Sequence, residues 1–592
     1  MNRREFIDFL MRSSAAMSAA GLGLGLTARA WSKSAAELYQ IPSYGSARLL
    51  HITDTHAQLK PVYFREPNVN LGLGSAFNRW PHKVGKNLLS ELGDLDPLQS
   101  HALTYLNFEE AAARFGKVGG FAHLKTLIDQ LRGSVPDGRS LLLDGGDTWQ
   151  GSGTALWTRG QDMVEATNRL GVDIMTGHWE FTYLEEEVHR NIELFNGTFV
   201  SQNTYATDDA IFDGVPMYDD MTGHIFKPYD IRTLGEHRIA VIGQAFPYTP
   251  IANPKRFIPN WTFGIRESEL AELVADIRAN ENVDAVVLLS HNGMDVDLKL
   301  ASQVSGIDVI LGGHTHDGVP VPVEVTNSGG VTVVTNAGSN GKFVGVLDLD
   351  LGKGRMKGYR YRLLPVFSEM LAPDPEMAAF IEQVRAPFKT VLDEPLAMAD
   401  SLLYRRGNFN GTFDQLICDA LRQELDAEIA LSPGFRWGTT ILPGDTITMD
   451  RLLDQTCMTY PETYVRDMPG SELKMILESV ADNLFNADPY YQQGGDMVRT
   501  GGLNYAMTPS AEMDARISDM TLANGQRIEA NKTYRVAGWA TVGSESPGAP
   551  VWDVVADYLR AAKTVTIERL ETPILKGVQG NPGIEDYVGS LG

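Results

Sequence analysis

The fold of this chain is decided by a recurring kind of stretch, of which ARLLHITDTH, Ala47 to His56, comes first. An apolar run with the length of a buried strand ends there in polar residues. Similar stretches are SLLLDGGDT (140–148), VDIMTGHWE (172–180), RIAVIGQAF (238–246), DAVVLLSHNG (284–293), IDVILGGHTH (307–316) and VTVVTNAG (331–338). Helical patterns such as ELAELVADIRAN, residues 269–280, lie between several of them. The alternation predicts an α/β layered fold with helices packed over sheets.

Carboxylates and imidazoles follow five of these strands. They are Asp54, His56, Asp147, His178, His291, His314 and His316. Layered α/β folds assemble their sites in loops at the carboxyl ends of strands. Both ligand types suit Mn²⁺, Zn²⁺ or Fe²⁺, and seven ligands suffice for two ions if one carboxylate bridges them. Two ions about 3.5–4 Å apart can clamp the attacking and leaving oxygens of a displacement.

Each of these motifs taken alone has a plainer interpretation. GGHTH, residues 312–316, is compatible with a polar turn, and DGGD, residues 144–147, with a tight turn capped by aspartates. A single histidine after a strand is more often a packed residue than a ligand. Their ordered occurrence at successive strand ends favours a metal site over these alternatives.

Length and composition restrict the function. The 592 residues, 43% of them hydrophobic, suffice for more than one core, so we expect two large domains. With 51 Lys and Arg against 75 Asp and Glu, the formal charge is −24, which disfavours nucleic acid as a partner. No internal stretch reaches the roughly eighteen apolar residues of a spanning helix, so we expect no stable membrane insertion. We expect a monomer.

The chain has two cysteines, Cys418 and Cys457. They could pair in an oxidising compartment. The helical spacing around Cys418 favours a buried, small apolar role instead, and neither cysteine has the spacing of a metal or redox site.

The N-terminus predicts export. Arg3 and Arg4 precede the uncharged stretch SSAAMSAAGLGLGLTA, residues 13–28, and Ala28-Arg29-Ala30 follows. This order is typical of a removable signal peptide, here residues 1–30, and the paired arginines favour the twin-arginine pathway. That pathway carries folded proteins, often with a cofactor loaded, so we expect a metal and a location in a bacterial periplasm.

Three parts follow the signal peptide. Residues 46–365 contain the strand-end ligands and predict a dimetal domain. Residues 366–395 have a helical pattern flanked by prolines, which is typical of a linker helix. Residues 396–592 mix helices, strands and turn signals, and we expect a second domain there.

The ordered motifs D-x-H, G-D, a histidine after a strand and G-H-x-H resemble those of the calcineurin-like metallophosphoesterases, and the whole chain resembles their 5′-nucleotidase group. The resemblance implies a β-sandwich flanked by helices, a linker helix and a C-terminal α/β domain that binds substrate. It implies one metal on Asp54, His56, Asp147 and His316, and a second on Asp147, His178, His291 and His314. Asp147 would bridge the two metals.

The stretch TGHWEF, Thr176 to Phe181, departs from this family, whose G-N-H-E motif would place asparagine at 178 and a catalytic histidine at 179. His178 can replace asparagine as a ligand. Trp179 cannot replace the histidine, because indole has one N–H donor and no basic nitrogen. Asp147, His178 and Trp179 are the candidate catalytic residues. Because the histidine is missing, ordinary nucleotidase activity is in doubt.

Longer segments resemble the SoxB family of thiosulfohydrolases from bacterial sulfur oxidation. They include TGHWEFTY (176–183), LYRRGNFNGTFDQLICDAL (403–421) and YQQGGDMVRTGGLNYAMTP (491–509). This resemblance implies a periplasmic enzyme with two Mn²⁺ ions, although the ligand types suit Zn²⁺ as well. Its substrate would be a cysteine S-thiosulfonate on the C-terminal arm of the carrier protein SoxYZ, from which water releases sulfate.

A sulfonate requires positive charge or N–H donors, and arginine fits tetrahedral oxyanions. Arg436, in the glycine-containing turn SPGFRWG, ranks first and Arg406 second, while Arg405 and Arg499 are further candidates. The glycines Gly494 and Gly495 allow close backbone approach to a substrate. The long non-periodic stretch 57–82 is interpreted either as the wall of a channel for the carrier arm or as a cover for an edge of the fold.

Two other functions stay open at the level of sequence. One is a periplasmic 5′-nucleotidase or nucleotide-sugar hydrolase, which Trp179 disfavours. The other is a catalytically silent metal-binding scaffold, which the full set of seven ligands disfavours.

Overall fold

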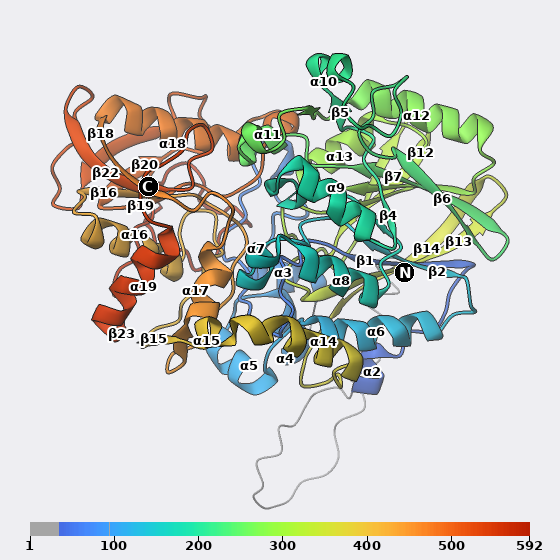
Figure 1. Ribbon diagram of the computed structural model, residues 1–592, viewed down its shortest axis with the longest axis horizontal. Helices are drawn as coiled ribbons and strands as arrows, with labels where there is room; N and C mark the ends of the chain where they lie inside the picture. Colours follow the sequence, from blue (N-terminus) through green and yellow to red (C-terminus); the bar gives the residue numbers. More distant parts are fainter. Residues whose placement is uncertain (1–34, 94, 592) are drawn as a thin grey trace, which may run out of the picture.

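The computed structural model describes residues 35–93 and 95–591 (Figure 1). The predicted signal peptide, residues 1–30, lies outside the described residues. Within the described part, no helix combines the length and the apolar character needed to cross a membrane.

Two six-stranded sheets form the centre of the first half of the chain. The first sheet runs in the order β14 (Arg355–Pro365), β13 (Phe343–Gly352), β1 (Ala47–Ile52), β2 (Ser140–Asp144), β3 (Ile174–Met175) and β4 (Thr198–Phe199). The second runs in the order β11 (Val323–Asn327), β12 (Gly330–Asn336), β10 (Val309–Gly312), β9 (Ala285–Ser290), β7 (His237–Gln244) and β6 (Tyr229–Leu234). A short pair, β5 (Tyr205–Ala206) and β8 (Trp261–Thr262), lies outside both sheets.

Each sheet has a parallel core with antiparallel strands added at its edges. Strands β1 to β4 are parallel neighbours, and so are β7, β9, β10 and β12. Strands β13 and β14 join the first sheet in antiparallel fashion, as β6 and β11 join the second. The carboxyl ends of the parallel strands therefore open on one edge of each sheet, which is where the candidate ligands follow.

The sheets pack face to face and helices cover their outer faces, as the predicted α/β layered fold requires. Neighbouring residues of one strand serve both sides: Leu49 belongs to the core between the sheets, and Leu50 to the core under the helices. Helices of this half are α2 (Ala35–Tyr39), α3 (Gly85–Leu92), α4 (Pro97–Leu103), α5 (Phe108–Phe115), α6 (Phe121–Gly133), α7 (Gly153–Thr158), α8 (Gln161–Leu170), α9 (Glu185–Leu194), α10 (Asp208–Asp213), α11 (Thr249–Ala252), α12 (Glu267–Asn280) and α13 (Met294–Gln303). The result is a β-sandwich flanked by helices.

The second half of the chain is a second α/β body, and its core clusters also include Trp179, Val69 and Leu71 from the first half. Its four-stranded sheet has the order β18 (Thr463–Pro469), β22 (Thr533–Trp539), β16 (Ile429–Ser432) and β19 (Arg499–Gly501). One three-stranded sheet has the order β17 (Thr446–Thr448), β15 (Pro395–Ala399) and β23 (Thr564–Val565). Another has the order β21 (Ile517–Leu522), β20 (Leu503–Met507) and β24 (Ile574–Leu575). Its helices are α16 (Thr412–Glu424), α17 (Met449–Thr456), α18 (Gly470–Phe485) and α19 (Val551–Ala562).

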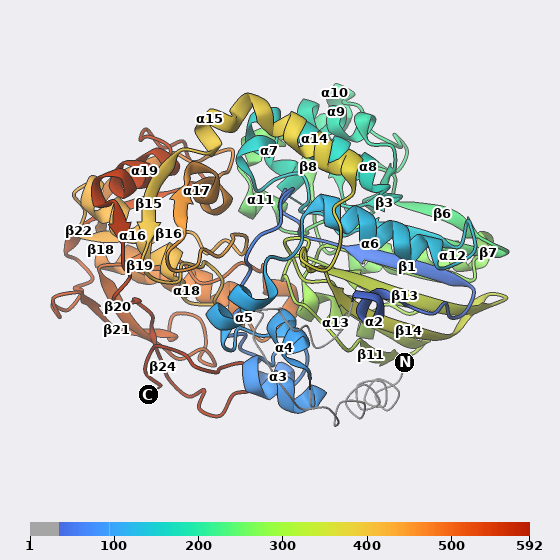
Figure 2. The same cartoon turned by 90° about the horizontal axis from the view of Figure 1, so that it is seen from below.

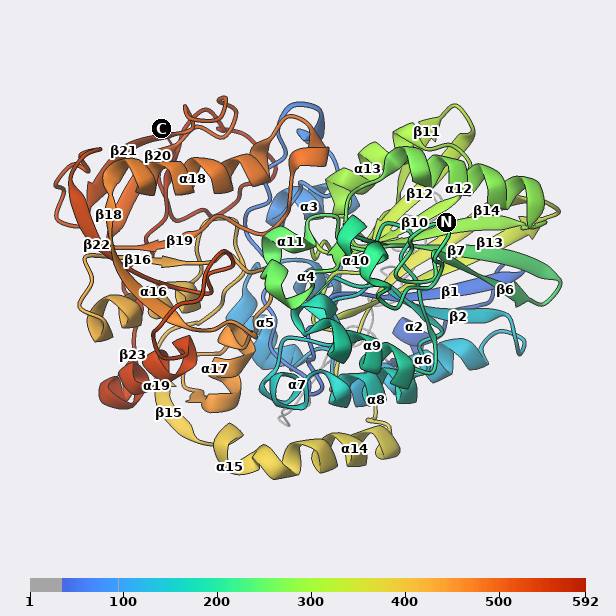
Figure 3. The same ribbon diagram turned by 45° about the horizontal axis from the view of Figure 1, so that its top comes forward.

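Helices α14 (Pro375–Arg385) and α15 (Lys389–Leu392) connect the two halves and run along one side of the molecule (Figure 3). Asp374 caps α14 by accepting a hydrogen bond from the backbone N–H of Met377. Arg385, at the end of α14, pairs with Asp450 of α17 at 2.6 Å. The segment for which we expected a linker helix is thus held against both halves.

The long stretch that begins at residue 57 leads to α3 and α4, which lie between the two halves of the molecule (Figure 2). The backbone N–H of Asn70 donates to the carbonyl of Gly583 at 2.7 Å, and the side chain of Asn581 donates to the carbonyl of Gly72 at 2.8 Å. Glu585 binds Lys86 from the same tail. The stretch therefore covers and anchors the tail of the second half.

His82 fastens the same stretch to the sandwich. Its Nε2 lies 2.8 Å from a carboxylate oxygen of Asp295 on α13. Burial lowers the pKa of His82, but the charges of Asp295 and, more weakly, Asp317, together with hydrogen bonds to Asp295 and Asn70, raise it by more, so the net pKa is above its usual value.

This raised pKa predicts that the His82–Asp295 pair stabilises the protein most at low pH. A histidine whose folded pKa exceeds its unfolded value contributes its full stability below about pH 6.5 and loses it as the pH rises through the folded pKa. Urea denaturation across this range should show that the stability difference between the wild type and His82→Gln narrows as the pH rises. A difference that stays constant would contradict the prediction.

Candidate metal centre

The structure brings the seven sequence-predicted ligands together in two buried clusters. One cluster contains Asp54, His56, Asp147 and His316, and the other contains Asp147, His178, His291 and His314. Within each cluster, one ligand atom from every residue lies within 4.8 Å of the others. Asp147 belongs to both, which is the arrangement expected of a bridging carboxylate.

The ligands come from the carboxyl ends of parallel strands in both sheets. Asp54 and His56 follow β1, Asp147 follows β2 and His178 follows β3. His291 follows β9, and the last two histidines follow β10 in the other sheet. The centre therefore lies across the end of the sandwich, and neither sheet alone could build it.

The ligand loops have an unusual backbone. Five of the seven ligands have a positive φ: Asp54 (51°), His56 (46°), Asp147 (58°), His314 (71°) and His316 (60°). Residues with a Cβ rarely adopt this conformation, which costs about 1–2 kcal/mol for each. Such strain persists where surrounding contacts fix the loop, and it is typical of functional sites.

Asp147 is the centre of the second cluster. Its carboxylate lies 3.1 Å from His178 Nδ1 and 3.0 Å from His291 Nε2. The same carboxylate lies 3.8 Å from His56 Nε2 in the first cluster. One carboxylate thus faces imidazoles from both clusters.

The first cluster is equally close. His316 Nε2 lies 3.1 Å from Asp54 Oδ1 and 3.0 Å from His56 Nε2. Asp54 also accepts the backbone N–H of His314 with both oxygens, at 3.0 and 3.1 Å. This carboxylate therefore fixes the loop that carries the two histidines of β10.

Two histidines are oriented by hydrogen bonds to carbonyl groups. His291 Nδ1 lies 2.6 Å from the carbonyl of Gly145, and His314 Nε2 lies 3.3 Å from the carbonyl of Gln493. A ring nitrogen that donates to a carbonyl leaves the other ring nitrogen as the ligand. The second bond crosses from the first half of the chain to the second.

The protonation of the centre fits divalent cations. Burial lowers the pKa of His56 to about 3, and burial together with neighbouring positive groups lowers the pKa of His314 and His316 well below the usual value. These imidazoles are therefore neutral, the form that binds metal. Burial also lowers the pKa of His291, but the charges of Asp147 and Asp54 outweigh it and raise the pKa to about 10.

The raised pKa of His291 means that the two carboxylates attract one positive charge into the centre, which bound cations would supply. His178 Nε2 is buried with no hydrogen-bond partner among the described residues. Carboxylates and neutral imidazoles are the donors preferred by Mn²⁺ and Zn²⁺. The residues present therefore fit a pair of divalent ions.

Trp179 lies beside this centre in an aromatic group. Its ring meets Trp437 edge-on at 5.0 Å and Phe435 edge-on at 5.5 Å, and these two rings stack on each other at 4.2 Å. Its side chain is buried, and its backbone N–H donates to Asp147 at 2.6 Å. The position after His178 is thus occupied by an apolar wall.

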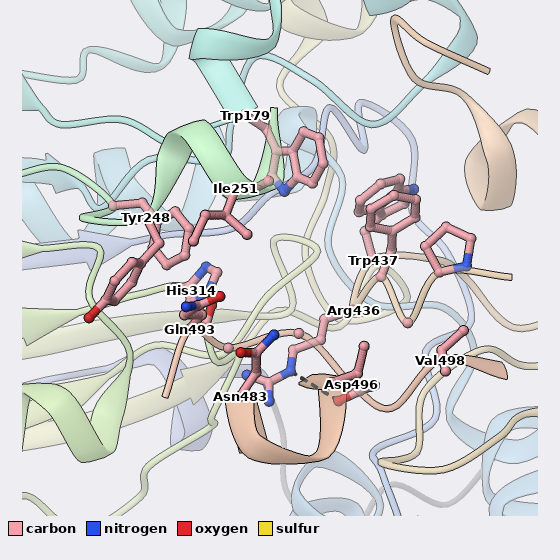
Figure 4. A pocket seen from close by; sticks show the side chains of 18 of the residues that line it. Trp179, Tyr248, Ile251, His314, Arg436, Trp437, Asn483, Gln493, Asp496 and Val498 are labelled. Carbon is pink, nitrogen blue, oxygen red and sulfur yellow. Dashed lines mark hydrogen bonds and ion pairs between the residues drawn. The ribbon is translucent and has the colours of Figure 1, made fainter. Parts of the chain in front are cut away.

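A cavity of about 330 Å³ is lined by residues of both clusters and by Trp179. Figure 4 shows part of this lining, with Trp179, His314 and Arg436 around the cavity. The second half of the chain also contributes Leu431, Tyr464, Ile476, Val480, Val498 and Trp539. The lining therefore combines charged and polar side chains with apolar ones.

The candidate arginines have different environments. Arg436 lines the cavity and is held by Asp496 at 3.0 Å, while its Nη1 is buried without a partner among the described residues (Figure 4). Arg406 is buried in an adjacent small cavity that Arg436 also lines. Both guanidinium groups lower the pKa of His316, so both are close to the metal centre.

Arg405 and Arg499, the further candidates, do not line the cavity. Both are fully buried and pair with Asp414, at 2.8 and 3.0 Å. Arg499 also pairs with Asp496 at 3.0 Å. Their physical role is to hold the second half of the chain together, because their charges are already matched inside its core.

The two glycines lie where the second half approaches the metals. Gly494 and Gly495 both line the cavity and have positive φ. A Cβ at position 494 would lie only 2.0 Å from His314 Nε2.

Cys418 and Cys457 are buried and unpaired in the core.

Glu180 is not among the residues predicted from the sequence. Its side chain is fully buried next to Asp147, although it directly follows Trp179 in the stretch TGHWEF. The only sequence signal for it is the glutamate at the end of the family motif G-N-H-E, which Glu180 retains. This position is not one of the metal ligands of the motif.

Comparisons with known proteins match both halves of the chain. The family model described as calcineurin-like phosphoesterase matches residues 47–318, and that of the 5′-nucleotidase C-terminal domain matches residues 397–553. The structure of the sulfate thiohydrolase SoxB from Thermus thermophilus is 37% identical and covers 91% of this chain and 98% of its own, with a TM-score of 0.83.

Curated relatives are more distant. The trifunctional nucleotide phosphoesterase YfkN of Bacillus subtilis is 26% identical over 76% of this chain and 32% of the relative. The 5′-nucleotidase of Bos taurus is 28% identical over 51% of this chain and 54% of the relative. The chain thus spans about a third of the first relative and about half of the second.

The contact between Gly494 and His314 yields a prediction about metal binding. Gly494→Ala should displace the His314 ring and weaken metal binding at the second cluster by roughly 10–100-fold, the usual effect of disturbing a ligand's support. The measurement is the number of Mn²⁺ ions retained per chain, by elemental analysis after dialysis.

Gly495→Ala is the matched control. Its φ of 76° is close to the 71° of Gly494, so both variants carry the same backbone strain. A Cβ at position 495, however, meets nothing closer than the carbonyl of Gly434 at 3.7 Å. Equal loss of metal from both variants would show that strain, and not the His314 contact, is responsible.

Proposed function

We propose a function from one premise: this chain belongs to the SoxB family, a branch of the calcineurin-like phosphoesterases with a 5′-nucleotidase C-terminal domain. Membership and the two Asp/His clusters make it a metal-dependent hydrolase. The specific activity we propose is that of a thiosulfohydrolase. It would release sulfate from a cysteine S-thiosulfonate carried by SoxYZ.

The observation that carries this proposal is Trp179 beside the metal centre. In the hydrolysis of a phosphomonoester the leaving group is an alkoxide, which is strongly basic and benefits from a nearby acid. A sulfur leaving group is far less basic, since a cysteine thiol has a pKa of about 8.5. An aromatic wall where the family places a histidine is compatible with the second leaving group and unfavourable for the first.

Two Mn²⁺ ions, the pair that the resemblance implies, would supply activated water and positive charge for the sulfonate oxygens. Asp54, His56, Asp147 and His316 would hold one ion, and Asp147 with His178, His291 and His314 the other. In the balanced reaction the water oxygen bonds to the terminal sulfonate sulfur, the bond between that sulfur and the next one breaks, and the electron pair stays on the carrier. Sulfate and a carrier persulfide result.

Arg436 supports an anionic substrate in this position. Asp496 fixes its Nε, and its Nη1 is buried without a partner among the described residues of the cavity wall (Figure 4). A guanidinium held in this way can bind sulfonate oxygens without losing much conformational freedom. Arg406 adds a second buried positive charge in the adjacent small cavity.

The shape of the cavity supports a substrate on a slender arm. About 330 Å³ is too little for a folded partner, but it accepts an extended segment that carries one modified cysteine. The apolar residues of its lining would contact the parts of the arm beyond the sulfonate. Export by the twin-arginine pathway to the periplasm, which the N-terminal sequence predicts, would place the enzyme with such a carrier.

A periplasmic 5′-nucleotidase or nucleotide-sugar hydrolase is the second candidate. It is favoured by the curated relatives, whose names refer to nucleotides. The first candidate is favoured by Trp179 and by the 37% identity to the Thermus thermophilus enzyme over nearly the whole of both chains.

Product analysis tests the proposal. Manganese-loaded enzyme is incubated with S-thiosulfonated carrier and, separately, with AMP, and sulfate and phosphate are measured. We expect sulfate from the carrier and no phosphate above background, because no acid assists an alkoxide at position 179. Phosphate without sulfate would establish the nucleotidase, and neither product would indicate a silent scaffold.

Trp179→His tests the role of the missing histidine. This variant should gain phosphomonoesterase activity of the size that one general acid–base group contributes, about 10²–10⁴-fold over background. Trp437→His is the control, because it introduces the same group into the same aromatic wall at a different position. If phosphate release by Trp179→His stays at background while both metals are bound, Trp179 does not separate the two chemistries.

A further inference from the structure

Glu180 makes four hydrogen bonds to backbone amides. Its Oε1 accepts from Thr148 at 2.7 Å and from Trp149 at 3.1 Å. Its Oε2 accepts from Asp147 at 3.1 Å and from His178 at 3.0 Å. The side chain is fully buried, so these amides are the groups that stabilise its charge.

These amides belong to two ligand loops. One loop follows β2 and carries Asp147, and the other follows β3 and carries His178. The short 3-10 helix η2 (Trp179–Thr182) turns the chain after His178, so that the side chain of Glu180 lies under both loops. One carboxylate therefore fixes the relative position of the bridging ligand and of a ligand specific to the second cluster.

The loop after β2 contains an unfavourable backbone conformation that these hydrogen bonds stabilise. Asp147 has a φ of 58°, an unfavourable conformation for a residue with a Cβ. In this conformation its amide is aimed at Glu180, and its carboxylate accepts the amide of Trp179 at 2.6 Å. Glu180 thus stabilises the backbone geometry that directs the bridging carboxylate toward both clusters.

A glutamine could not replace this carboxylate. Both oxygens of Glu180 accept two N–H groups each, whereas an amide side chain has a single oxygen. Its NH₂ group would face two backbone donors, which would be left buried and unpaired, and this is unfavourable. An aspartate would keep the charge, but its carboxylate would be one methylene further from the amides.

We propose that Glu180 is a positioning residue of the metal centre, which holds Asp147 and His178 at the separation that two divalent ions require. It touches neither substrate nor reacting atoms, and it acts through the two ligands. The inference concerns the centre itself, so it stands whether the substrate is a thiosulfonate or a nucleotide.

The test measures metal binding directly, on the full chain. Apo protein is titrated with Mn²⁺, and affinity and stoichiometry are obtained by calorimetry, with electron paramagnetic resonance used to detect paired ions. We expect Glu180→Gln to weaken binding of the second Mn²⁺ by roughly 10–100-fold, the range for lost support of a ligand. Glu180→Asp should weaken it as well, since charge without reach does not hold both loops.

Glu478→Gln is the matched control. Glu478 is also a buried glutamate that accepts backbone N–H groups, from Arg516 at 3.2 Å and Ile517 at 2.8 Å, but it lies in the second half of the chain and lines neither cavity named above. This variant should lower the melting temperature and leave Mn²⁺ binding unchanged.

The two results distinguish positioning from general stability. Weaker binding of the second ion and loss of the paired-ion signal in Glu180→Gln, with both retained in Glu478→Gln, would support the proposal. Wild-type Mn²⁺ affinity and pairing in a folded Glu180→Gln would overturn it. Equal loss of metal in the Glu478 variant would overturn it too, because the effect would then follow from lowered stability.

Discussion

The carboxylate of Asp147 is the group on which the arrangement of the centre depends. It lies at the end of β2, in contact range of imidazoles that arrive from both sheets. A buried carboxylate is tolerated only where donors or cations surround it. The parallel strands on either side deliver those groups, and the second half of the chain closes over them with Gln493 and Gly494.

The layers of the first domain and the clustering of the seven candidate ligands could be predicted because their signals are local. An apolar run predicts each strand, and each candidate ligand lies within four residues of such a run. Parallel strands place their carboxyl ends together, so a pattern in the sequence becomes a cluster in space. Strand β3 shows this. It has only two residues of regular structure, yet it brings His178, three residues further along, to Asp147.

The structural roles of Arg405, Arg499 and Glu180 could not be predicted because their partners are far away in the sequence or belong to the backbone. Arg405 and Arg406 are neighbours, yet one is matched by Asp414 in a core and the other is left beside the metal centre. Glu180 binds amide groups, which every residue has and no sequence distinguishes. The positive φ values of the ligand loops have no residue signature either, because most of the residues concerned are not glycine.

The anchoring of the stretch after residue 57 to the tail of the chain has a consequence for the order of folding. Asn68 and Asp586 are in contact although 518 residues separate them, so the contact forms only after a ribosome has passed both. Closing so long a loop is slow and entropically unfavourable until other contacts shorten it. The sandwich can therefore assemble its ligand loops early in synthesis, whereas Arg436 and Gly494 are made later, so the cavity can be completed only after most of the chain has been synthesised.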